Sequence, residues 1–282
     1  MSHHCRGGPP WPPVQELQTS QWTRFRVRDE QFSFALPVRP AVENRRILLE
    51  SKGERLETTL ARFSNGVLYL IVVLENPSPK QSLDSFIDAR SHFTRPLNKK
   101  SEKKLTLDGA SGKAYTLHGI DGETQFFSKG DLLFQFAAYN AVPDDVRVTK
   151  FFSSISLATN KDSIEVSESL SSPLPGDSTL RIDSPEKVFT PQQTDKSFDL
   201  VMNAHPDYTE MARQNQIKGT VVLQCVLSAN GTITGISVVS GLPYGLTERA
   251  IAAARRVKFI PAMKNGKYVS ISTRLVYNFD LF

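Results

Sequence analysis

A break in hydrophobic patterning constrains this chain more than any other feature. Apolar residues recur at regular spacings before residue 158 and after residue 199, whereas Ser, Thr, Pro and charged residues dominate residues 159–198. A segment of that composition buries too little apolar surface to fold and is typical of a linker. We therefore predict two domains, residues 22–158 and residues 199–282, joined by a linker at residues 159–198.

The first 21 residues are rich in Pro and Gly, and we expect a disordered leader. They contain no apolar core of the kind that a secretory signal requires. The longest apolar run, residues 67–74, is far shorter than the ~20 residues of a membrane helix. Its flanks, Asn65-Gly66 and Asn76-Pro77, indicate a buried strand instead. No signal peptide or transmembrane helix is therefore predicted within this sequence.

The pattern of residues 22–158 predicts an α+β domain. Short strands are expected around Phe25 and Phe34, and a hairpin turns at Asn65-Gly66. Helices are expected from about Ser82 to Pro96 and over residues 144–152. Further strands are expected at residues 105–107, 114–117, 124–127 and 132–139.

The two ends of this domain resemble the PsbP-type α/β sandwich. At the start, the resemblance rests on Trp22, Phe32-Ser33-Phe34, Leu36-Pro37 and Pro40. At the end, it rests on Phe151-Phe152-Ser153-Ser154-Ile155. It implies an accessory or binding domain and transfers no chemistry.

The pattern after residue 199 predicts the order helix–strand–strand–helix–strand. Residues 221–227 alternate as in a strand, and Asn230-Gly231 predicts a type I′ hairpin turn. Gly235 is expected to form a bulge in the return strand. A second helix should begin with Thr247 as its N-cap and bury Leu246, Ala250, Ala253, Ala254 and Val257.

This order resembles the C-terminal domain of TonB, a small binding module of the periplasm or cell envelope. The motifs that carry the resemblance are Pro206-Asp207-Tyr208-Thr209 with Ala212-Arg213, Gly219-Thr220-Val221-Val222-Leu223, Asn230-Gly231-Thr232-Ile233, Val238-Val239-Ser240-Gly241, Ala250-Ile251-Ala252-Ala253-Ala254 and Lys258-Phe259-Ile260-Pro261-Ala262. The family fold is two helices on a three-stranded antiparallel sheet. The resemblance therefore implies an interaction module without catalytic activity.

The family resemblance also implies a partner and a binding mode. In the family, the TonB box of an outer-membrane transporter adds a strand beside the last strand, so that main-chain hydrogen bonds supply the grip. The partner-binding residues carried over to this chain are Val269, Ser270, Ile271, Ser272, Thr273, Arg274, Leu275, Val276, Tyr277, Asn278 and Phe279, with His205 and Tyr208 as further contacts. Tyr208 has an alternative interpretation, since it can also anchor the first helix in the core.

One departure from the family leaves two functions open. Energy-transducing members carry an N-terminal membrane helix and a long Pro-rich stretch, and neither is visible here. If coding sequence upstream of Met1 supplies that helix, an inner-membrane motor complex is a further partner. Otherwise the chain is a soluble periplasmic scaffold or sensor with a TonB-like docking domain. A homodimer is left open as well.

No constellation for chemistry is found in the sequence. Gly112-Lys113 lacks the first Gly and the Ser or Thr of a phosphate-binding loop. The two cysteines, Cys5 and Cys225, cannot form a metal site, and no H-E-x-x-H pattern occurs. The net charge of +5 is scattered, which speaks against a nucleic-acid partner. We predict no cofactor, no metal and no enzymatic activity.

Overall fold

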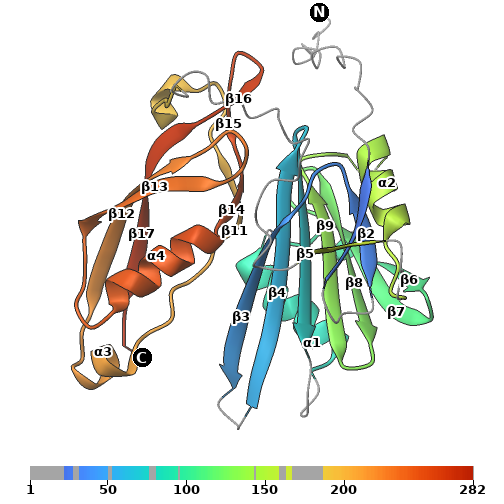
Figure 1. Cartoon of the computed structure of the whole chain (residues 1–282), viewed down its shortest axis with the longest axis horizontal. Helices are drawn as coiled ribbons and strands as arrows, with labels where there is room; N and C mark the ends of the chain where they lie inside the picture. Colours follow the sequence, from blue (N-terminus) through green and yellow to red (C-terminus); the bar gives the residue numbers. More distant parts are fainter. Residues whose placement is uncertain are drawn as a thin grey trace, which may run out of the picture.

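The computed structural model describes residues 22–27, 32–49, 53–75, 81–94, 96–142, 144–158, 163–166 and 187–281. It shows an α+β protein in which antiparallel sheets carry helices on their faces (Figure 1). The predicted leader at residues 1–21 and the predicted linker residues 159–162 and 167–186 lie outside the described residues.

A seven-stranded antiparallel sheet is the centre of the N-terminal domain. Its strands are β3 (Ala41–Leu49), β4 (Gly53–Ser64), β5 (Val67–Glu75), β6 (Lys103–Leu107), β7 (Ala110–Thr116), β8 (Gly122–Lys129) and β9 (Leu132–Tyr139), and their order is β3-β4-β5-β9-β8-β7-β6. The turn between β4 and β5 has positive φ at both Asn65 and Gly66, as a type I′ hairpin requires. Residues 67–74 of β5 are buried on both faces, which explains their continuous apolar pattern.

One face of this sheet is covered by a small sheet and a helix. The small sheet has the order β10-β1-β2 and consists of β1 (Thr23–Val27), β2 (Ser33–Leu36) and β10 (Ile164–Val166). The helix is α2 (Val146–Ser154), which Asp145 caps through its side chain. Phe25, Phe34 and Phe151 are fully buried in the core beneath them. Strand β10 lies within the range predicted as linker and pairs in parallel with β1.

The other face is covered by α1 (Leu83–Phe93) and by the C-terminal domain (Figure 1). The helix begins close to the predicted start: Ser82 is its N-cap, and the Ser82 hydroxyl accepts from the Ser85 amide. Phe86 and Ile87 of α1 pack into the same core as Val201 and Ile260 of the C-terminal domain. The two domains therefore share apolar core on this face of the sheet.

A three-stranded antiparallel sheet with the order β13-β12-β17 forms the C-terminal domain. Its elements are β12 (Gly219–Leu227), β13 (Ile233–Ser240) and β17 (Ile271–Phe279), with the helices α3 (Glu210–Gln214) and α4 (Leu246–Arg256). Alternate residues of β12 are fully buried, and α4 buries the apolar face that its spacing predicts. Two short pairs complete the domain: β11 (Asp199–Met202) with β14 (Lys258–Ile260), and β15 (Ala262–Lys264) with β16 (Lys267–Val269).

Three local expectations for this domain are wrong, and a fourth is confirmed. Between β12 and β13, φ is positive at Gly231 but not at Asn230, so the turn is not type I′. Gly245, not Thr247, is the N-cap of α4, because the Thr247 hydroxyl is engaged by the backbone of Leu242. Of the partner-binding residues expected in the last strand, Val269 lies in β16 and Ser270 between the two strands, because β17 begins at Ile271. The bulge at Gly235 is present, with a register shift and positive φ there.

Polar and aromatic contacts hold the two domains together. The Lys258 ammonium lies 2.7 Å from the Glu43 carboxylate on β3. Tyr268 packs edge-to-face on Phe63, with 4.9 Å between ring centroids, and its hydroxyl accepts from the Asn140 amide at 2.9 Å. Gly231 also abuts Phe63, so closely that a Cβ at this position would lie 2.6 Å from the Phe63 Cβ. The loop after β12 therefore fits closely against β4.

Candidate partner-binding edge

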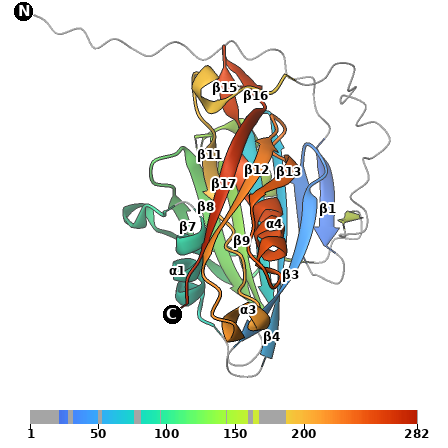
Figure 2. The same ribbon diagram turned by 90° about the vertical axis from the view of Figure 1, so that its left-hand side faces the viewer.

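Strand β17 lies at one edge of the sheet β13-β12-β17. Among the described residues, it therefore has a neighbouring strand on one side only. Its register with β12 runs without a shift from Gly219 opposite Phe279 to Leu227 opposite Ile271. Figure 2 looks onto the domain that contains these strands. Ile271, Tyr277 and Phe279 are buried, whereas Arg274, Val276 and Asn278 are exposed. The side-chain alternation therefore matches the pattern that the sequence predicts.

The direction of the β17 backbone groups follows from a contact outside the sheet. The Ser272 amide donates to the Phe189 carbonyl at 2.8 Å, and the Phe189 amide donates to the Ser270 carbonyl at 2.9 Å. Ser272 therefore points its backbone groups away from β12. Because backbone direction alternates along a strand and the register has no bulge, the N–H and C=O groups of Arg274, Val276 and Asn278 point the same way.

The contact with Phe189 occupies only the start of this edge. It is a parallel bridge between Phe189 and Ile271. Continuing the ladder would need an N–H at residue 191 to reach the Ser272 carbonyl, but residue 191 is proline and has none. The chain turns instead into the 3₁₀ helix Pro191–Gln193. The edge from Arg274 to Asn278 therefore has no strand partner among the described residues.

Tyr208 and His205, the two further predicted contacts, lie apart from this open edge. The Tyr208 hydroxyl donates to the Ile217 carbonyl, and its ring packs edge-to-face on Phe279 with 5.7 Å between centroids. These contacts anchor the segment that leads into α3. The His205 carbonyl accepts from Arg256 at 3.2 Å, and the residue lines a cavity between the domains. Of the predicted contacts, residues 271–279 therefore lie in one strand, and His205 lies away from it.

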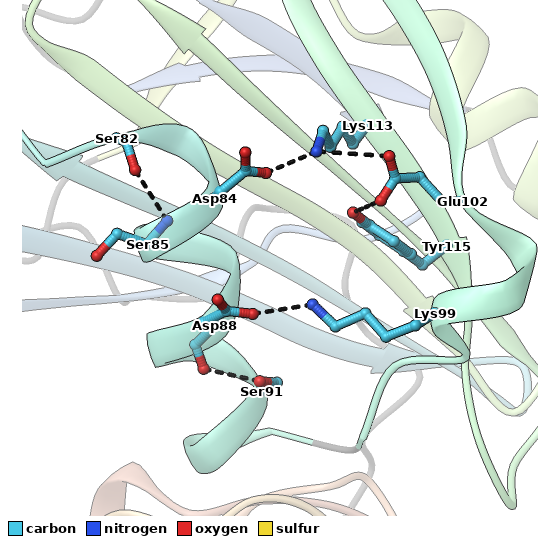
Figure 3. A network of polar contacts seen from close by, with 9 residues as sticks. All are labelled: Ser82, Asp84, Ser85, Asp88, Ser91, Lys99, Glu102, Lys113 and Tyr115. Carbon is cyan, nitrogen blue, oxygen red and sulfur yellow. Dashed lines mark hydrogen bonds and ion pairs between the residues drawn. The ribbon is translucent and has the colours of Figure 1, made fainter.

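A polar network on the N-terminal domain includes Lys113 (Figure 3). The Lys113 ammonium lies 2.6 Å from Asp84 and 3.4 Å from Glu102, and Tyr115 donates to Glu102 at 2.6 Å. The hydrogen bond from Tyr115 lowers the pKa of Glu102, and the bond to Asp84 raises the pKa of Lys113. The Lys113 ammonium is shared by two carboxylates, so the network ties α1 to β7 and leaves Lys113 fully engaged.

Comparison with known proteins identifies the C-terminal domain. Residues 204–281 match the family described as the Gram-negative bacterial TonB protein C-terminal. This part of the chain is a TonB C-terminal domain. The solution NMR structure of Pseudomonas aeruginosa TonB CTD is similar, with 22% identity over 31% of this chain and 92% of its own, and a TM-score of 0.26. A search of curated proteins finds no match.

TonB C-terminal domains are protein-interaction domains that generally contact outer-membrane proteins. The described part of this chain holds no group of three or more His, Cys, Asp or Glu side chains placed to bind a metal. None of the helices in the described ranges is long and apolar enough to cross a membrane.

The bridge between Phe189 and β17 was not predicted from the sequence. Without it, the β17 residues whose backbone groups point away from β12 could not be identified. The missed signal is the apolar pair Val188-Phe189 next to Pro191, which stands out within a polar stretch. Phe189 is partly buried against the core that contains Cys225 and Ile271.

Proposed function

We propose that the TonB C-terminal domain binds the TonB box of an outer-membrane transporter by strand addition at the open edge of β17, in support of energy-coupled transport across the outer membrane. The observation that carries this proposal is the outward direction of the backbone groups at Arg274, Val276 and Asn278. An edge of this kind is a ready template for an extended segment.

The length of the open edge sets the expected affinity. Three outward-facing residues offer an N–H and a C=O each, and every hydrogen bond contributes a net ~0.5–1.5 kcal/mol. Association costs at least ~4 kcal/mol before any contact is made. The six main-chain bonds therefore leave at most ~5 kcal/mol, which corresponds to a dissociation constant of roughly 0.2 mM or weaker before side-chain contacts are added. Weak binding suits a partner that must be released after each cycle.

Side chains beside the edge give the partner its selectivity. The Val276 side chain is 58% exposed, and Arg274 is exposed with its Nε donating to the Gln224 side chain at 3.4 Å. A partner residue above Val276 gains from being apolar, and one beside Arg274 gains from being acidic. The TonB box that this edge selects should therefore combine an apolar residue with a carboxylate two positions away.

The test compares Val276→Pro with Val276→Ala in the full chain. Proline removes one outward donor without emptying the core, and alanine keeps that donor while it trims the same side chain. Circular dichroism first establishes that both variants are folded. Fluorescence anisotropy with labelled peptides from the N-termini of outer-membrane transporters then measures binding. We expect Val276→Pro to weaken binding by roughly 2- to 12-fold relative to Val276→Ala, the equivalent of one hydrogen bond. Equal affinities of the two folded variants would exclude strand addition at this edge.

A second candidate function is a periplasmic scaffold or sensor without motor coupling. One observation favours it: the C-terminal domain packs closely against the seven-stranded sheet, with Val201 and Ile260 in the shared core. In this case the N-terminal, PsbP-like domain is the ligand- or protein-binding unit. Cross-linking of the full-length protein in cells separates the two functions, because capture of inner-membrane motor subunits supports energy coupling, and capture of transporters alone supports the scaffold.

A further inference from the structure

A cavity of about 450 Å³ lies where the C-terminal domain meets α1, β3 and β4. Both domains contribute to its walls. Leu74, Phe86 and Met202 supply apolar surface. The charged side chains of the lining are those of Arg45, Arg90, Arg256, Glu43, Glu57 and Asp207. The volume lies within the ~300–1,000 Å³ range of small-molecule sites.

The charges around the cavity leave one cation without a carboxylate. Each of three acidic side chains has its own basic partner. Arg90 lies 3.1 Å from Glu57, Lys258 lies 2.7 Å from Glu43, and Arg45 lies 2.5 Å from Asp207. The fourth basic side chain, Arg256, has no carboxylate within ion-pair distance among the residues that the structure describes.

The position of Arg256 makes this imbalance costly. Its Nη2 donates to the His205 carbonyl at 3.2 Å, and its buried Nε has no hydrogen-bond partner in the described part of the chain. Desolvation and the neighbouring charge of Arg45 lower the pKa of Arg256, and the charges of the surrounding carboxylates, Asp207, Glu43 and Glu57, act in the opposite direction. Arg256 is half-buried and lines the cavity, so an anion in the cavity that accepts from its guanidinium offsets part of the desolvation of this charge.

We propose that this cavity binds a small carboxylate with an apolar body, held by Arg256 through its carboxylate and by Leu74, Phe86 and Met202 through its body. This site is separate from the open edge of β17, and the inference goes beyond the proposed function. Because both domains line the cavity, an occupant also joins them.

The probes are octanoate, 1-octanol and octylamine, which share one apolar body and differ in charge. Isothermal titration calorimetry with the full chain measures binding, and thermal unfolding provides a second readout. We expect one octanoate per chain and a rise in Tm. Octanol should bind roughly 10- to 150-fold more weakly, the factor that corresponds to a hydrogen bond with a charged group. Octylamine should bind more weakly still.

Two variants assign the recognition to Arg256. Arg256→Gln should weaken octanoate binding by roughly the same factor, and Arg255→Gln, a change at its exposed neighbour, should leave it unaltered. Ala89→Trp keeps every charge but fills the cavity from α1, so it should abolish binding even if Arg256→Gln does not fold. The proposal is overturned if octanoate produces neither heat nor a shift in Tm. It is equally overturned if octanol binds as tightly as octanoate, or if folded Ala89→Trp still binds octanoate.

Discussion

Gly231 provides a direct test of how the two domains pack. A Cβ at this position would lie 2.6 Å from the Phe63 Cβ, and φ at Gly231 is +82°. Gly231→Ala should therefore destabilise the protein in two ways. The alanine is forced into the left-handed region, and its Cβ clashes with Phe63 of β4. Gly235→Ala is the matched control, since its φ is +58° but the nearest atom, Val226 Cγ2, is 3.7 Å away.

The difference between the two variants isolates the contact between the domains. Left-handed backbone costs an alanine ~1–2 kcal/mol at either position. Overpacking adds ~1–3 kcal/mol at residue 231 alone. We therefore expect Gly235→Ala to lower the free energy of unfolding by ~1–2 kcal/mol and Gly231→Ala to lower it by ~2–5 kcal/mol.

Urea unfolding followed by circular dichroism measures both free energies of unfolding in the full chain. Because separating the domains relieves the clash with Phe63, Gly231→Ala should also split the transition into two steps, whereas Gly235→Ala should retain the steps of the parent. Equal losses and identical transitions in the two variants would falsify the close packing of this loop on β4.

Further predictions concern the core, its ionisation and the segments beside it. Cys225 is fully buried. Cys225→Asp should therefore prevent the C-terminal domain from folding, because it places an unpaired charge in the core, whereas Cys225→Val should fold. Thermal unfolding compares the two variants. Burial raises the pKa of the Cys225 thiol to about 11. Since this folded pKa exceeds the unfolded value, the associated stability is complete below about pH 8.5 and falls as the pH approaches 11. Urea unfolding of Cys225→Ala should lack that part of the pH dependence. Residues 163–166 and 187–198 pair with β1, β15 and β17, so peptide mapping after limited proteolysis should find no early cuts in them.

The elements that sequence predicted well are those in which one periodicity dominates. Strand β12 alternates without interruption, and α4 buries a helical stripe, so local pattern and tertiary burial agree. The hairpin at Asn65-Gly66 follows from two residues that tolerate positive φ. The type I′ expectation at Asn230 was wrong because a five-residue loop, residues 228–232, replaces the two-residue turn and needs positive φ at Gly231 only.

The elements that were not predicted depend on their pairing partners and not on an apolar periodicity of their own. Strand β3 carries Glu43, Asn44 and Arg45, which have no alternation of apolar residues, and it is a strand because β4 pairs along its whole length. Strand β10 is only three residues long and exists through its parallel pairing with β1. The cavity beside Arg256 could not be predicted, because its walls come from domains whose mutual packing no local pattern encodes.

Amide hydrogen exchange, read by NMR residue by residue, tests strand addition at β17 most directly. In the free protein, the outward amides of Arg274, Val276 and Asn278 should exchange quickly, and those of Leu275 and Tyr277, which face β12, should exchange slowly. Saturation with a TonB-box peptide should slow exchange of the three outward amides and leave the inward ones unchanged. A peptide that binds but slows amides elsewhere, with these three still exchanging as in the free protein, would contradict the proposal that β17 is the partner-binding edge.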